Sequence, residues 1–160
     1  MAKDPQHHNS IPGISTGPHR FEMMGWISCA PFERLLNMTI VTAAKGRATL
    51  TMPFLKEYAQ GAGLMHGGAL VSLADTAVVM AIKSIIEPQT HFATTCLQSQ
   101  FLRPVKKGLI TARARITDRD GRTLHGRATV FDDLDQPVLE FTSTFRIAKD
   151  ARIQGISFAE

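Results

Sequence analysis

One long apolar segment near the middle of the chain constrains the fold more than any other feature. Residues 67–86, GGALVSLADTAVVMAIKSII, are apolar on nearly every side of a helical projection, and their only charged residues are Asp75 and Lys83. A helix that is apolar all round requires burial on every side. At a rise of about 1.5 Å per residue it is about 30 Å long, enough to cross a sheet or a bilayer. Each charge would cost about 3 kcal/mol near the bilayer centre, so we expect burial in protein and no membrane span.

Segments with the alternating pattern of β-strands lie before and after this helix. In residues 47–54 the apolar Ala48, Leu50 and Met52 alternate with polar side chains, which predicts a strand with one buried face. The same pattern predicts strands within residues 91–105, 108–117, 122–133 and 137–148. Turn residues at 118–121 and 132–136 predict hairpins between the last three of these strands.

The order of these segments favours one architecture. A short helix at 30–38, with Phe32, Leu35 and Leu36 on one side, is followed by two strands, the long helix and four more strands. Clean alternation favours antiparallel strands with one face covered. A curved antiparallel sheet wrapped around one long central helix satisfies the sheet and the helix together. This is the hotdog fold, of the α+β class.

The length and composition of the chain suit a single domain. The chain has 160 residues, of which 44% are hydrophobic and 20% charged, and this is enough for one hydrophobic core. We expect a flexible N-terminal tail at 1–20, one domain at 21–150 and a C-terminal tail at 151–160.

The charge and cysteine patterns limit the partners and the compartment. The formal net charge is +4, yet no basic run is longer than Lys106–Lys107, which favours a few phosphate contacts over nucleic-acid binding. Cys29 and Cys96 have neither metal-site nor redox spacing, and the N-terminal segment lacks the apolar core of a signal peptide. We therefore expect a reduced, cytoplasmic protein without a metal site.

The start of the long helix carries the most informative motif, His66-Gly67-Gly68, with Asp75 nine residues after the histidine. The two glycines leave the unpaired backbone N–H groups of the helix start open to a carbonyl, or they serve only to permit a tight turn. Asp75 has no basic residue one helical turn away, and an unpaired carboxylate among apolar residues is unfavourable. It is either catalytic or a structural group bonded to Ser72, to Thr76 or to another subunit.

The segment HGGALVSLAD, followed one strand later by LQSQFLRPV, resembles the hotdog-fold acyl-CoA thioesterases of the phenylacetate-pathway type over residues 30–148. The resemblance implies hydrolysis of acyl-CoA thioesters to the free acid and coenzyme A, without a further cofactor. It implies a homodimer, or a tetramer built from two dimers, with an active site at the dimer interface. In this reading the N–H of Gly67 polarises the thioester carbonyl. Asp75 is then the general base or the nucleophile, and the sequence does not choose between these two roles.

Further site residues follow from the same resemblance. Gln60 would orient the carbonyl or a water, and Thr94, with Thr95 as the alternative, would hold the water. His66 would orient the loop or transfer a proton. The substrate-binding residues would be Gly68 at the helix start and several basic residues for the phosphates of coenzyme A. The basic residues are Arg103, Lys106 and Lys107 after one strand end and Arg122, with Arg119, at the next hairpin.

Two other functions share parts of this pattern. A non-catalytic acyl-CoA-binding hotdog module would keep the glycine loop but would not need Asp75. A hotdog dehydratase would place a differently spaced histidine and acid after a different helix start. Apolar Met65, Val71 and Val79 are compatible with aromatic and with medium-chain acyl groups, so the sequence does not predict acyl specificity.

Overall fold

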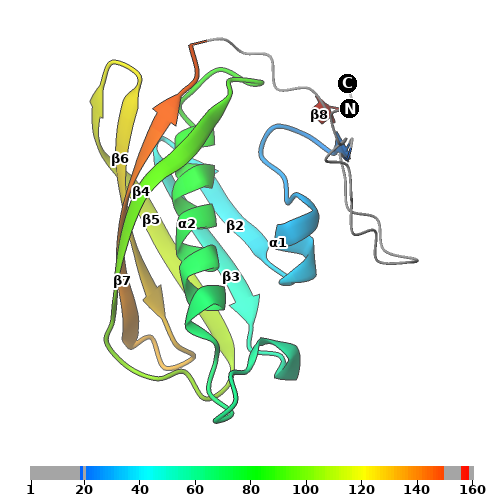
Figure 1. Ribbon diagram of the computed structural model, residues 1–160, viewed down its shortest axis with the longest axis vertical. Helices are drawn as coiled ribbons and strands as arrows, with labels where there is room; N and C mark the ends of the chain where they lie inside the picture. The colour runs from blue at the N-terminus through cyan, green and yellow to red at the C-terminus, as the bar shows by residue number, and fades with distance from the viewer. Residues whose placement is uncertain (1–18, 20, 150–155, 159–160) are drawn as a thin grey trace, which may run out of the picture.

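The structure is a computed structural model that describes residue 19, residues 21–149 and residues 156–158 (Figure 1). The N-terminal tail expected at 1–20 lies outside the described residues, apart from His19. Two short strands, β1 (Phe21–Met23) and β8 (Ile156–Phe158), form a parallel pair of their own, and β8 lies within the expected C-terminal tail. Three-residue strands carry too little pattern for the sequence to reveal them.

The main sheet has six antiparallel strands in the order β2-β3-β5-β6-β7-β4. The strands are β2 (Thr39–Ala44), β3 (Arg47–Pro53), β4 (Phe92–Phe101), β5 (Leu109–Asp120), β6 (Thr123–Phe131) and β7 (Pro137–Ile147). The strands lie where the sequence predicts them, except that β5 continues to Asp120, through most of the turn predicted at 118–121, and the hairpin turns at Gly121 and Arg122. The sheet order leaves β2 and β4 as the two edges, and β4 pairs with β7 although it directly follows the long helix in the chain.

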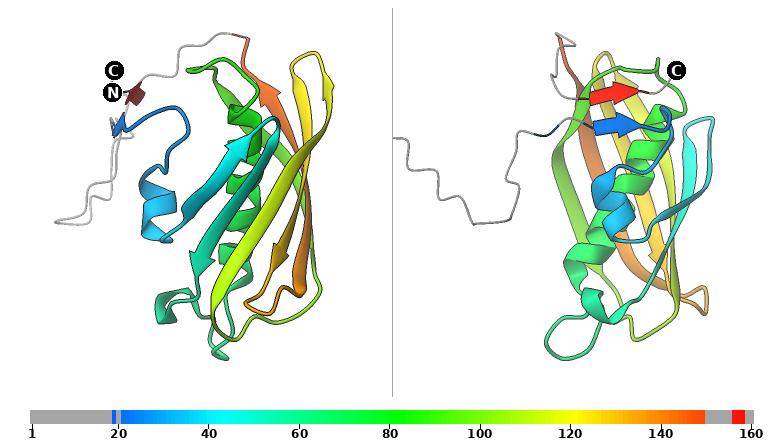
Figure 2. Two further views of the ribbon diagram at one scale, coloured as in Figure 1. Left: turned by 180° about the vertical axis from the view of Figure 1, so that it is seen from behind. Right: turned by 90° about the vertical axis from the view of Figure 1, so that its right-hand side faces the viewer.

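The long helix α2 (Gly67–Lys83) packs across the sheet, chiefly against β3, β5 and β6 (Figures 1 and 2). It ends three residues before the predicted end at 86. Its C-cap is Ser84, whose hydroxyl donates to the carbonyl of Ala81 and accepts from the N–H of Gly46. Pro88 follows shortly afterwards, and the residue before a proline is disfavoured in helical conformation. No described helix is both long and apolar enough to span a membrane.

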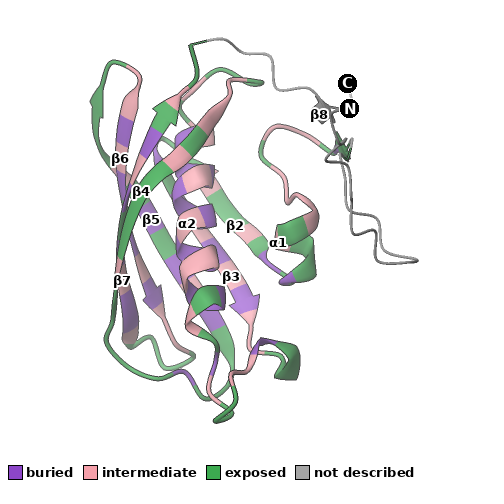
Figure 3. Cartoon of the chain, viewed as in Figure 1, coloured by how far each residue is buried: buried purple, intermediate pink, exposed green. Residues whose placement is uncertain are grey.

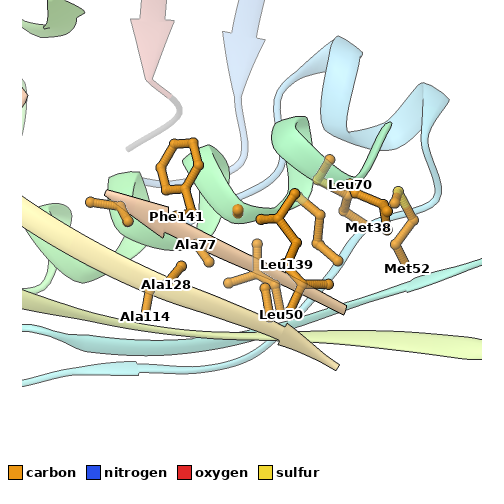
Figure 4. Packing of buried hydrophobic residues seen from close by; sticks show 14 of the residues in the cluster. Met38, Leu50, Met52, Leu70, Ala77, Ala114, Ala128, Leu139 and Phe141 are labelled. Atoms are coloured by element: carbon orange, nitrogen blue, oxygen red, sulfur yellow. The ribbon is translucent and has the colours of Figure 1, made fainter. Parts of the chain in front are cut away.

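Small residues in the sheet allow α2 to lie close to it. Ala112, Ala114 and Ala128 are buried beneath the helix, and a Cβ on Gly126 would overlap the side chain of Val78. Larger apolar side chains on the neighbouring strands pack beside these alanines, since Leu50 pairs with Ala112 and Phe141 with Ala128. Figure 4 shows Leu50, Leu139 and Phe141 in this core. The central helix is therefore buried by the sheet, in agreement with the α+β hotdog fold predicted from the sequence.

A segment between β1 and β2 contacts the C-terminal end of α2. It contains the helix α1 (Pro31–Leu35) and is fastened by the indole N–H of Trp26, which donates to the carbonyl of Lys83 at 2.9 Å. The prediction of a helix over 30–38 with three packed apolar residues was partly wrong. Asn37 takes a left-handed conformation with φ 51°, which ends the helix, and only Leu36 packs into the core while Phe32 and Leu35 are exposed. A 3-10 turn, η1 (Lys56–Tyr58), lies between β3 and α2.

Candidate active site

Asp75 lies in the middle of α2 and faces the first half of β4. Its two carboxylate oxygens accept a hydrogen bond from the Thr94 hydroxyl at 3.2 and 3.1 Å. The side chain is half-buried, and burial raises the pKa of the Asp75 carboxyl above its ordinary value of 3.8, while the bond from Thr94 acts in the opposite direction. No Lys or Arg of the described chain forms an ion pair with it. Burial thus makes the Asp75 carboxylate a stronger base than a solvent-exposed aspartate, as a proton acceptor requires.

The choice between Thr94 and Thr95 is decided by the local geometry of β4. Thr94 pairs with Phe145, whereas the next paired residue is Cys96, so a bulge occurs at Thr95. Thr95 is exposed, and its hydroxyl donates to the carbonyl of Thr144 instead of facing the helix. Thr94 alone lies against Asp75. The structural partners considered for Asp75 from the sequence were wrong in part, because Ser72 donates to the carbonyl of Gly68.

His66 is the N-cap residue of α2. Its Nδ1 accepts a hydrogen bond from the N–H of Gly68 at 2.9 Å, which satisfies one of the backbone donors at the helix start. This bond requires an unprotonated Nδ1, so a neutral His66 carries its proton on Nε2. The histidine therefore orients the loop at the start of the helix.

The N–H of Gly67 has no acceptor among the residues that the structure describes. It is the first residue of the helix, where backbone N–H groups lack intrahelical partners and the helix dipole is positive. A Cβ at this position would lie 2.9 Å from the ring of Phe101, the last residue of β4. Glycine lets the ring of Phe101 lie close to the helix start, and the free N–H remains available to an oxyanion.

Gln60 lies in the same groove as Gly67 and Phe101. The groove has a cavity volume of about 420 Å³, and Arg103 also lines it. The side-chain oxygen of Gln60 accepts from the N–H of Ala62 at 2.5 Å, so one end of this amide is occupied by a local turn. Phe101 is a site residue that the sequence analysis did not single out, although it begins the Phe-Leu-Arg-Pro segment that carried part of the resemblance.

The basic residues expected at the coenzyme A phosphates fall into two groups. Arg103, Lys106 and Lys107 are exposed on the segment that follows β4, whose Val105 carbonyl accepts from the N–H of Met65 just before the helix start. Arg122 lies at the opposite end of the sheet, where its guanidinium donates to the carbonyl of Ile147. Within one chain the structure brings only the first group near Gly67.

A second cavity, of about 250 Å³, lies on the other side of Asp75. Val79, Phe92 and Phe145 give it an apolar lining, and it extends from Thr94 to Lys83 and Trp26. Of the residues expected beside an acyl group, Val79 lines this cavity. Met65 lines the Gly67 groove instead, and Val71 packs on the core. Trp26 comes from a segment without strong periodicity, so no sequence signal placed it here.

Gly67 and Asp75 lie eight residues apart on one helix, which separates them by about 12 Å along its axis. A single thioester carbonyl cannot contact both groups of one chain. Among the described residues, no group of three or more His, Cys, Asp or Glu side chains is placed to hold a metal ion.

Comparisons with known proteins identify the family of the chain. A family model described as the thioesterase superfamily matches residues 62–138, from just before α2 to the start of β7. A protein of Pasteurella multocida named "Putative esterase PM0788" is 33% identical over 102 residues, which are 62% of this chain and 73% of that protein. This chain belongs to the thioesterase superfamily.

Solved structures of related proteins have the same fold. The conserved protein PA5202 from Pseudomonas aeruginosa matches with a TM-score of 0.72 and 26% identity, over 75% of this chain and 95% of that one. The E. coli PaaI protein from the phenylacetic acid degradation operon matches with a TM-score of 0.69 and 26% identity, over 80% and 88% of the two chains. Membership of the superfamily, together with relatives named as esterases and thioesterases, supports thioester hydrolysis in general.

Proposed function

We propose that this protein hydrolyses acyl-CoA thioesters at a site shared by two copies of the chain, with Asp75 of one copy and Gly67 of the other. The observation that carries the proposal is the placement of these groups along the edge strand β4. Asp75 is bonded to Thr94 near one end of β4, and Gly67 packs against Phe101 at the other end.

Antiparallel pairing of two β4 edges would bring these groups together. Thr94 and Phe101 lie opposite Phe145 and Leu139 of β7, so along this ladder, which passes over the bulge at Thr95, they are equally far from Gln98. A two-fold axis at that point places Thr94 of one copy opposite Phe101 of the other, and Asp75 then lies beside Gly67 of the second copy. The site needs both copies, because one chain separates the two groups by about 12 Å.

The surface of β4 supports such a pairing. The strand is an unpaired edge and is exposed over most of its length (Figure 3). Leu97 and Phe101 are 45% and 54% exposed and lie on the same face of the strand, and Leu102 beside them is 40% exposed. Edge strands with apolar side chains favour association through their free backbone groups. A homodimer, or a tetramer of two such dimers, covers both the edge and the apolar side chains.

The chemistry follows from the properties of the two groups. The thioester carbonyl oxygen accepts from the Gly67 N–H, which stabilises the negative charge as a tetrahedral intermediate forms. With Asp75 as general base, the carboxylate takes a proton from a water held by Thr94. The water oxygen bonds to the carbonyl carbon, the carbon–sulfur bond breaks, and the proton passes to the coenzyme A thiolate. With Asp75 as nucleophile, its carboxylate displaces the coenzyme A thiolate to form a mixed anhydride, and water then hydrolyses the anhydride to the free acid and the Asp75 carboxylate.

Coenzyme A would lie over the groove that contains Gly67. Arg103, Lys106 and Lys107 are the described basic residues placed near it, and their charges suit the phosphates of the nucleotide. Gln60, with one amide end held by Ala62, has its NH₂ group available to the carbonyl or the water. Nothing in this mechanism needs a metal or a further cofactor.

The test is an assay of acyl-CoA hydrolysis by the purified protein, in which the release of the free coenzyme A thiol is measured. We expect turnover of short or medium acyl groups, lost on substitution of Asp75. Tight binding of acyl-CoA without turnover would instead identify a non-catalytic binding module, and binding of neither substrate nor product would refute both functions.

A further inference from the structure

The cavity next to Thr94, the hydrogen-bond partner of Asp75, is also lined by Lys83. Asp75, Val79 and Lys83 follow one another at intervals of four residues along one face of α2, and the last two line the cavity together with Thr94. The floor is apolar, from Phe92 and Phe145. A group held at Asp75 therefore extends over an apolar surface toward Lys83.

The ammonium of Lys83 is held in place but has no acceptor. It lies 5.0 Å from the centre of the Trp26 ring, in a cation–π contact, and the side chain is half-buried. No carboxylate or carbonyl in the described part of the chain accepts a hydrogen bond from it or forms an ion pair with it. Burial lowers the pKa of Lys83, and the nearby charge of Glu33 acts in the opposite direction. A half-buried ammonium without a hydrogen-bond acceptor gains stability from any anion that enters the cavity.

We propose that Lys83 selects acyl groups that carry a carboxylate at their far end, so that the substrates are thioesters of dicarboxylic acids. This inference rests on the proposed function, because it assigns the acyl group of that same reaction. The apolar floor contacts the methylene or ring portion, and the ammonium donates to the distal carboxylate. Trp26, which lines the same cavity, holds the ammonium through its ring.

The dimensions favour a short acyl group. The α carbons of Asp75 and Lys83 are about 12 Å apart along the axis, and helical side chains lean toward the N-terminus, which brings the ammonium back toward Asp75. The cavity volume of about 250 Å³ lies below the roughly 300–1,000 Å³ of sites for drug-sized ligands. A six-carbon diacid, with about 6 Å between its carboxyl carbons when extended, matches this space.

The test compares three thioesters of equal chain length: hexanoyl-CoA, 6-hydroxyhexanoyl-CoA and adipoyl-CoA. For the wild type we expect kcat/KM to be at least about tenfold higher for adipoyl-CoA than for hexanoyl-CoA, the scale of a hydrogen bond to a charged group. The hydroxyl compound should lie between them. Lys83→Met should remove the preference while it changes the rate with hexanoyl-CoA little. Lys83→Gln, which removes the charge but keeps a polar side chain, is measured beside it, so that the test does not depend on the folding of a single variant.

Lys56→Met is the matched control, since Lys56 is an exposed lysine on η1 away from both cavities, and it should keep the preference. A wild type that hydrolyses hexanoyl-CoA as well as adipoyl-CoA, or that prefers the hydroxyl compound, would overturn the inference and leave the proposed function intact. A preference for adipoyl-CoA that persists in both Lys83 variants would also overturn the inference and leave the proposed function intact. Failure to hydrolyse any of the three would count against the proposed function, and the inference would fall with it.

Discussion

The substitution Asp75→Asn separates a catalytic carboxylate from a structural one. Asparagine has nearly the shape of aspartate, and its side-chain oxygen can still accept the hydrogen bond from Thr94. The change therefore removes the charge and the ability to take a proton, and it leaves the packing of α2 intact. We expect kcat to fall by about 100-fold or more, the scale of a lost general base, while KM changes much less.

The stability of this variant follows from the raised pKa of Asp75. Since the folded state raises this pKa above the ordinary 3.8, it holds the proton more tightly than the unfolded chain does. The free energy of unfolding then falls as the pH rises from the unfolded value through the folded one, and the ionised carboxylate remains unfavourable at every higher pH. Asparagine removes this contribution, so the melting temperature at neutral pH should hold or rise.

The assay measures kcat, KM and thermal melting for the wild type, Asp75→Asn and the control Asp118→Asn, which removes an exposed carboxylate at the end of β5. The control should match the wild type in activity. A stable Asp75→Asn dimer with near wild-type kcat would refute the catalytic role. A lower melting temperature, with activity that follows the folded fraction, would make Asp75 a structural residue.

Four further outcomes test the site. Thr94→Val removes the bond that opposes the raised pKa of Asp75, so the acidic limb of the pH profile of kcat/KM should move to higher pH, whereas Thr94→Ser should leave it in place. Leu97→Glu should convert the dimer to a monomer in sedimentation and abolish activity with it, and an active monomer would exclude the shared site. Gly67→Ala places a methyl group against Phe101 and should lower kcat by at least about tenfold without unfolding, with circular dichroism as the check. Treatment with a chelator should leave activity unchanged, and loss of activity that a divalent metal restores would contradict the mechanism.

Much of the fold follows from periodicity alone. The alternation in β3 and β5 and the all-round apolar character of α2 each predict an element that the structure contains. The short strands β1 and β8 and the early end of α1 do not follow, because they depend on single residues such as Asn37 and on pairing between distant segments. Local sequence patterns carry little information about such pairings.

The site divides in the same way. Asp75 stands out in the sequence because a carboxylate is unusual in the middle of an apolar helix. Gly67 and His66 stand out because they lie at the start of that helix. Phe101 and Trp26 are ordinary apolar residues in the sequence, and only the packing of β4 and of the segment before α1 brings them to the two cavities. The grouping of the basic residues was the least predictable, because the sequence cannot show that Arg122 lies at the opposite end of the sheet from Arg103.

The position of β4 at the edge of the sheet also affects how the chain folds during synthesis. β4 is synthesised well before β7, its neighbour in the described sheet. At about 5–20 residues per second, the chain from Phe101 to Ile147 takes on the order of 2–10 s to make. During that time the nascent chain holds a strand with both edges free. The polar outer face of β4, with Gln98 and Gln100, limits aggregation of this intermediate, and its apolar inner face makes β7 and then a second chain the favoured partners.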